Sequence, residues 1–96
     1  MKPDSAEDHN GLAEALLAQG RPAQARRHIE RALAIQPGFA EAHNNLGRAL
    51  LAEGRLDDAI AHFQVAVRLK PNFAAARQNL AATSDRRARE GMSFPE

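Results

Sequence analysis

A repeat of 34 residues constrains the fold of this chain more than any other feature of its sequence. When the 96-residue sequence is shifted by 34 positions, residues 6–39 align with residues 40–73, and sixteen of the 34 pairs are identical. Similarity at a period between about 20 and 50 residues is typical of solenoids, in which each unit buries its apolar face against its neighbours. We therefore expect two copies of one stacking unit.

Each copy contains two apolar stripes at helical spacing, which predicts two helices per copy. In the first half of the copies the stripe residues are Leu12, Leu16 and Leu17, then Leu46, Leu50 and Leu51. The second halves carry Ala25, Ile29, Ala32 and Leu33, then Ala59, Phe63, Ala66 and Val67. We expect these stripes to face the core.

Glycine and proline mark the ends of the predicted helices. Gly20 and Gly54 follow the first stripes, where a left-handed residue commonly ends a helix. Pro37 and Pro71 follow the second stripes, where a helix cannot continue. The predicted fold is all-α. Its helices are expected at about 6–19, 22–35, 40–53, 56–69 and 74–89.

This pattern resembles the tetratricopeptide repeat (TPR) family. The matching residues in the second copy are Leu46, Gly47, Leu50, Gly54, Ala59, Phe63, Ala66 and Pro71. The N-N-L-G segment is similar to repeats of the O-GlcNAc-transferase-like superhelix. The resemblance implies a right-handed solenoid with repeats at 6–39 and 40–73. One departure is the position often held by tryptophan in the family, which is His9, His43 and Arg77 here.

The third unit begins like the others and then becomes polar. Ser84 and Asp85 stand where the copies have paired leucines, and three arginines follow closely. A helix with one apolar and one polar side is what the end of a solenoid needs. We therefore interpret residues 74–90 as a capping helix, and expect residues 1–5 and 91–96 to be disordered.

Composition and residue spacing argue against nucleic-acid binding, membrane association and catalysis. The formal net charge is +1, cysteine is absent, and no apolar run is long enough to cross a membrane. We expect a cytoplasmic protein that binds neither nucleic acid nor membranes. Asp57 and Asp58 fall in a first helical turn, where carboxylates stabilise the helix. The pattern offers no framework for nucleophilic catalysis, so we predict no enzyme activity, and we expect no cofactor.

The four histidines form two equivalent sets, His9 with His43 and His28 with His62. Equivalent residues on stacked helices lie about 10 Å apart, whereas zinc ligands must meet within about 2 Å of the ion. We therefore expect these histidines to contribute to helix packing and predict no metal site.

The family resemblance implies a concave groove, lined by the first helix of each repeat and by the capping helix. This groove usually holds an extended peptide or a partner's helix. The residues expected to bind peptide are Asn10, Glu14, Leu17, Glu41, Asn44, Asn45, Arg48, Leu51, Gln78 and Asn79.

Two binding modes of the family can be compared with these residues. Chaperone-binding members hold a C-terminal carboxylate, but only Asn45 matches their set, and Glu14 would repel a carboxylate. The other mode is an asparagine ladder, because an amide can pair with any peptide backbone. Asn45 and Asn79 hold positions of this ladder, whereas Gly11 interrupts the ladder in the first copy. The alternative is that these asparagines satisfy polar groups of the protein's own helices and turns.

We therefore expect a non-catalytic scaffold that binds a peptide or protein segment in the groove. Asn45 should contribute most, and Asn45→Ala is expected to weaken binding without lowering thermal stability. Two alternatives stay open. The chain could be a self-assembling structural module, a dimer or a higher oligomer, since about three repeats are usually needed for stability. It could also be a TPR segment of a larger enzyme.

Overall fold

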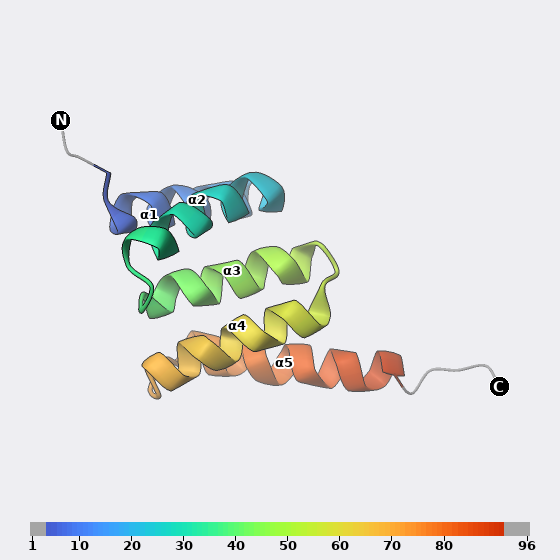
Figure 1. Ribbon diagram of the computed structural model, residues 1–96. Coiled ribbons are helices and arrows are strands. Elements are labelled where there is room, and N and C mark those ends of the chain that lie inside the picture. The colour runs from blue at the N-terminus through green and yellow to red at the C-terminus, as the bar shows by residue number, and fades with distance from the viewer. Residues whose placement is uncertain (1–3, 92–96) are drawn as a thin grey trace.

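The computed structural model describes residues 4–91, which form five helices and no strands. The helices are α1 (Ala6–Ala18), α2 (Pro22–Ile35), α3 (Ala40–Ala52), α4 (Leu56–Leu69) and α5 (Ala74–Gly91). Figure 1 shows them stacked in chain order, with the α1–α2 pair at one end of the array and α5 at the other. The predicted all-α fold is confirmed. No helix in the described part is long and apolar enough to cross a membrane.

The two repeats end their first helices in the same way. Gly20 and Gly54 have φ angles of 75° and 81°, a conformation that costs side-chain-bearing residues energy. The amide of Arg21 donates to the Leu16 carbonyl at 2.9 Å, and Arg55 donates to Leu50 at the same distance. These bonds form a Schellman motif, which satisfies carbonyls that the helix leaves unpaired.

The N-terminus of α1 is more ordered than its sequence indicates. We expected residues 1–5 to be disordered, but Ser5 is the N-cap of α1 and accepts a 3.3 Å hydrogen bond from the Asp8 amide. Asp4 forms an ion pair with Arg31 of α2. Residues 1–3 and 92–96, the remainder of the predicted disordered ends, lie outside the described residues. Gly91, expected in the tail, is the last residue of α5.

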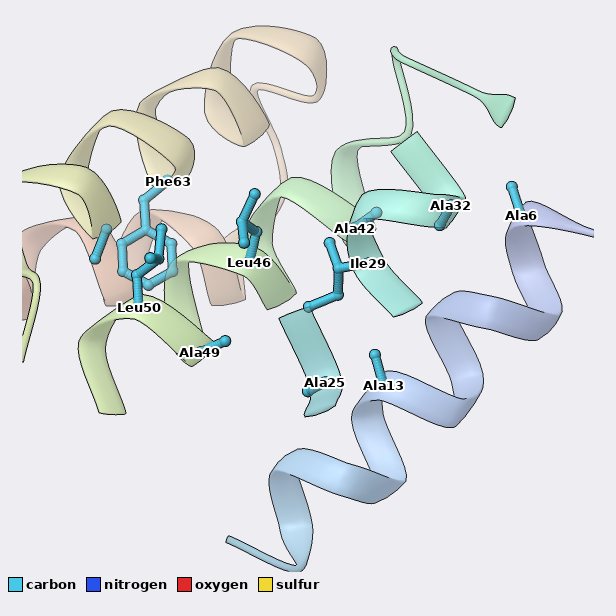
Figure 2. Close-up of a cluster of buried hydrophobic side chains, with 11 residues drawn as sticks. Ala6, Ala13, Ala25, Ile29, Ala32, Ala42, Leu46, Ala49, Leu50 and Phe63 are labelled. Carbon is cyan, nitrogen blue, oxygen red and sulfur yellow. The ribbon is translucent and has the colours of Figure 1, made fainter. Parts of the chain in front are cut away.

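The core runs between the helix pairs as a single cluster of small and large apolar residues (Figure 2). Ile29 of α2 and Phe63 of α4 are fully buried. The Phe63 ring packs directly on Gly47 of α3, where an added Cβ would lie under 3.0 Å from three ring carbons. Close contact between α3 and α4 therefore depends on the absence of a side chain at Gly47.

The predicted first stripe is buried in α3 but only partly in α1. Leu46 is 7% exposed and Leu50 is 4% exposed, whereas Leu12, which is equivalent to Leu46, is 47% exposed. The prediction that Leu12 faces the core is wrong. In α3 this side of the helix is covered by the preceding repeat, and among the described residues α1 has no preceding helix to cover it.

The last helix packs mainly on α4 and to a smaller extent on α3. Only Ala76 and Thr83 of α5 are buried, and most of its other side chains are exposed. This one-sided burial agrees with the predicted role of a helix that ends the array.

Candidate functional site

Helices α1, α3 and α5 are neighbours in the array, and the residues predicted to bind peptide all belong to them. Their side chains differ strongly in exposure. Glu14, Arg48 and Gln78 are exposed. Leu17, Glu41, Leu51 and Asn79 are half-buried. Asn10, Asn44 and Asn45 are buried. We call the surface formed by Glu14, Leu17, Arg48, Leu51 and Gln78 the α1–α3–α5 face.

The asparagines bind one another across neighbouring helices instead of facing solvent. The Asn45 side-chain amide donates to Asn10 Oδ1 at 2.8 Å, which joins α3 to α1. Asn79 donates to Asn44 Oδ1 at 3.0 Å, which joins α5 to α3. The donor and the acceptor lie 35 residues apart in both cases, one residue more than the repeat period. These asparagine side chains therefore satisfy polar groups of the protein's own helices, the alternative considered from the sequence.

Asn45 holds the centre of this network and is 1% exposed. Besides its bond to Asn10, its amide nitrogen lies 3.4 Å from Glu14 Oε2. Its carbonyl oxygen accepts a 2.9 Å hydrogen bond from Arg48 Nη1. The Asn45 amide therefore has partners for both its donor and its acceptor. Buried amides that lose such bonds are costly, so Asn45→Ala should lower stability, contrary to the expectation from sequence.

Glu41 is paired away from the other predicted residues. Its carboxylate accepts a 2.7 Å hydrogen bond from Lys70 Nζ, at the C-terminal end of α4. This bond lowers the pKa of Glu41 below its ordinary value. The Lys70 ammonium also lies 5.1 Å from the centre of the Phe73 ring, within the range of a cation–π contact. Glu41 thus stabilises the junction between α3 and the α4–α5 turn.

The histidines form pairs that were missed in the sequence, within each repeat rather than between repeats. His9 Nδ1 lies 3.2 Å from His28 Nδ1, and His43 Nδ1 lies 3.3 Å from His62 Nδ1. Both pairs are separated by 19 residues. This identical spacing in two antiparallel helices was the available signal.

The ring geometry indicates one shared proton in each histidine pair. The ring centres are 5.5 Å apart, more than the Nδ1 distance by about the width of a ring, so the two Nδ1 atoms point at each other. His43 Nε2 lies 2.9 Å from the Pro37 carbonyl and must donate to it. His43 Nδ1 is then the acceptor, and His62 Nδ1–H the donor. Burial, and next the neighbouring His43, lower the pKa of His62.

The described residues contain no group of three or more His, Asp or Glu side chains placed to hold a metal ion. Metal ligands direct their lone pairs to one common point. The facing Nδ1 atoms of each histidine pair instead leave room for a proton between them. The α1–α3–α5 face presents one carboxylate, one guanidinium, an amide and two leucines.

Comparison with known proteins agrees with this architecture. A model of the tetratricopeptide repeat family matches residues 10–72. No curated protein sequence matches the chain. Among solved structures, the first TPR domain of human RPAP3 is similar with a TM-score of 0.82 and 23% identity, over 90% of this chain and 68% of that one.

The second TPR domain of human RPAP3, solved in complex with the HSP70 peptide SGPTIEEVD, has a TM-score of 0.79 and 21% identity. The match covers 83% of this chain and 67% of that one. At these identities the likeness establishes the arrangement of helices.

Proposed function

Because this chain belongs to the tetratricopeptide repeat family, we propose that it is a non-catalytic scaffold that binds a protein or peptide segment on its α1–α3–α5 face. The observation that carries the proposal is the composition of this face. It presents an exposed carboxylate, an exposed guanidinium and an exposed amide beside two half-buried leucines. A surface with both hydrogen-bonding groups and apolar contact area suits an extended segment.

The two leucines provide the apolar part of this surface. Leu17 and Leu51 are half-buried and pack against the core with one side, so they are held in place before a ligand arrives. Preformed apolar sites bind with less loss of conformational entropy than flexible ones. Glu14, Arg48 and Gln78 lie beside them and would select polar groups of the ligand.

The HSP70 peptide of the RPAP3 complex is a poor candidate for the ligand of this chain. That peptide ends in two glutamates, a valine and an aspartate. Glu7 and Glu14 are exposed on α1, and neither has an ion-pair partner among the described residues. Carboxylates facing carboxylates repel each other. We therefore propose a ligand that is not uniformly acidic.

The proposal is tested with a random peptide library displayed on phage and selected on the purified chain. Selected peptides are synthesised, and their affinity is measured by fluorescence anisotropy. The double variant Gln78→Arg, Ala82→Arg places two long side chains at exposed positions of α5, one at Gln78 of the face and one a helical turn beyond it. It should weaken binding more than about tenfold, as expected for loss of central contacts.

A matched control substitutes the same residue types outside the face. The double variant Ala61→Arg, Gln64→Arg alters two exposed positions of α4 and should change the affinity by less than about twofold. Equal losses in both double variants, or the absence of any selected peptide that discriminates between them, would contradict the proposed function. Location in the cytoplasm and the absence of nucleic-acid binding stay predictions.

Self-association is a second candidate, favoured by the 47% exposure of Leu12 on the outer side of α1. A second copy that covered Leu12 would remove apolar surface from water. Sedimentation over a concentration series tests this candidate. If α1 mediates assembly, Leu12→Gln should shift the chain toward the monomer, whereas Ala61→Arg on α4 should not.

A further inference from the structure

Helix α1 differs from all other described helices in its carboxylates. Every other described Asp or Glu side chain belongs to an ion pair. Glu7, Asp8 and Glu14, all on α1, have no ion-pair partner among residues 4–91. Arg48 of α3 is likewise exposed and paired with no described carboxylate. The α1–α3–α5 face therefore presents a negative and a positive side chain that the fold does not neutralise.

Glu14 and Arg48 approach the same buried amide from opposite ends. Glu14 lies beside the amide nitrogen of Asn45, and Arg48 donates to its carbonyl oxygen. No described ion pair joins the two charges, whereas elsewhere Arg26 pairs with Glu53 and Lys70 with Glu41. Asn45 thus occupies the place where Glu14 and Arg48 would otherwise meet. The hydrogen bond that the Asn45 amide donates to Asn10 Oδ1 holds the amide in this position.

Resting on the proposed function, we propose that this face selects a segment with two opposite charges, a basic side chain over Glu14 and an acidic side chain over Arg48. Asn45 is the positioning residue that keeps these two charges apart and available. A guanidinium held by one hydrogen bond still has donors for a carboxylate. Glu7, two turns from Glu14 on α1, extends the negative region along the helix.

Removal of the Asn45 amide has a specific consequence for the ligand. In Asn45→Ala, nothing lies between the Glu14 carboxylate and the Arg48 guanidinium, and the two can pair directly. Both charges are then satisfied within the protein, and a ligand must break that pair before it binds. The variant should therefore lose its preference for charged ligands, although Glu14 and Arg48 are still present.

The matched control is Asn44→Ala. Asn44 is buried like Asn45, and it too forms a hydrogen bond across helices, in which it accepts from Asn79. Its substitution removes a comparable buried bond but leaves Asn10, Glu14, Asn45 and Arg48 in contact. Thermal unfolding followed by circular dichroism shows whether both variants are folded at the assay temperature.

The experiment starts from peptides that the phage library yields on the wild-type chain. Peptides whose binding depends on the face should combine Lys or Arg with Asp or Glu. Each is compared with a synthetic counterpart in which glutamine replaces the charged residues. We expect the charged peptide to bind wild type about fivefold more tightly than its neutral counterpart. Asn44→Ala should keep this preference, and Asn45→Ala should reduce it to less than about twofold.

Surface variants provide a test that does not depend on the stability of Asn45→Ala. Glu14→Gln and Arg48→Gln alter exposed positions and each removes one charge. The first should abolish the preference for the basic residue of the peptide, and the second the preference for the acidic residue. Loss of both preferences in Asn44→Ala, or retention of both in the two surface variants, would overturn the inference.

The outcomes for the two proposals are distinct. If selected peptides depend on the α1–α3–α5 face but show no charge pattern, the charge selection is wrong and the proposed function stands. If no selected peptide is sensitive to the Gln78→Arg, Ala82→Arg variant, the proposed function itself fails.

Discussion

The two repeats build the same helix pair with different pairs of small and large buried residues. In the first repeat Ala13 of α1 and Ile29 of α2 are both fully buried and belong to the same core cluster. In the second repeat the equivalent residues are Gly47 and Phe63. A larger residue on one helix is matched by a smaller residue on the other, which keeps the interior densely packed. The smaller residue at Gly47 therefore makes room for Phe63, which is larger than the equivalent Ile29.

The same comparison distinguishes the ends of the array from its middle. Helix α3 has neighbours on several sides, and eight of its thirteen residues are buried, compared with three of thirteen in α1. At Leu12 and Leu46, which are chemically identical, the difference follows from the surroundings, since no described helix precedes α1. The same residue at equivalent positions of a short repeat protein thus contributes unequally to the free energy of folding.

The largest expected effect is that of Gly47→Ala. The new methyl group would lie under 3.0 Å from Cε1, Cδ1 and Cζ of the Phe63 ring, so α3 and α4 must separate. We expect a loss of about 3 kcal/mol in the free energy of unfolding, measured by urea denaturation. The double variant Gly47→Ala, Phe63→Ile reproduces the pair of the first repeat and should recover more than half of that loss. If the double variant recovers no stability, residue volumes at these two positions do not compensate each other, contrary to our proposal.

Substitution of the two capping glycines should instead give equal effects in both repeats. Gly20→Ala and Gly54→Ala each place a side chain at a positive φ angle, and neither new Cβ meets another atom within 4 Å. The cost is therefore one of backbone conformation, about 1 kcal/mol for each variant. Thermal unfolding of the two variants should agree closely. A clear difference between them would show that the ends of α1 and α3 depend on packing as well.

Thr83 extends the comparison to the third unit, where a substitution should stabilise the protein. Its hydroxyl oxygen is buried and has no hydrogen-bond partner within residues 4–91, whereas the equivalent residue of α3 is Ala49. Thr83→Ala removes an unsatisfied polar atom and introduces a better helix former, so the free energy of unfolding should rise by about 1 kcal/mol. Ser84→Ala, at an exposed neighbouring position, is the control and should change stability less in urea denaturation.

The smallest expected effect is a pH dependence from the second histidine pair. In the unfolded chain His62 titrates at its ordinary pKa of about 6.5, and in the folded chain burial and His43 lower that pKa. The unfolded state therefore binds more protons below about pH 6.5, so stability is complete above that pH and falls as the pH decreases. Because His62 is partly exposed, the loss should be less than about 1 kcal/mol.

The variant His62→Asn tests this assignment. Urea denaturation at pH 8 and pH 5 should show a smaller acid-induced loss for His62→Asn than for the wild type. His28→Asn makes the same substitution in the first repeat and serves as the matched comparison. An unchanged acid response in His62→Asn would assign the pH dependence to other groups.

The helices and their order followed from the sequence because their signals are local. Gly20, Gly54, Pro37 and Pro71 act through the backbone conformations of their own residues, so their effect can be read without a partner. The 34-residue period showed that the units stack, and the family model and the solved structures confirm this fold.

The candidate site was only partly predictable. From the sequence we predicted that α1, α3 and α5 carry the site and that Glu14 and Arg48 belong to it, and the role of these residues stays a prediction. It did not indicate that Asn10, Asn44 and Asn45 are buried, because asparagine occurs both at surfaces and in hydrogen-bonded interiors. The choice between those settings depends on which residue of the next helix stands opposite.

By itself, the sequence determined that this protein is an all-α repeat with helix ends at fixed glycines and prolines, since periodicity and backbone preference are properties of short segments. Only the tertiary structure decided that His9 pairs with His28, that Leu12 is exposed, and that the Asn45 amide lies between Glu14 and Arg48. The two contacts join residues on different helices, and the exposure of Leu12 depends on which described helices pack beside α1. They are therefore set by the relative rotation and position of whole helices.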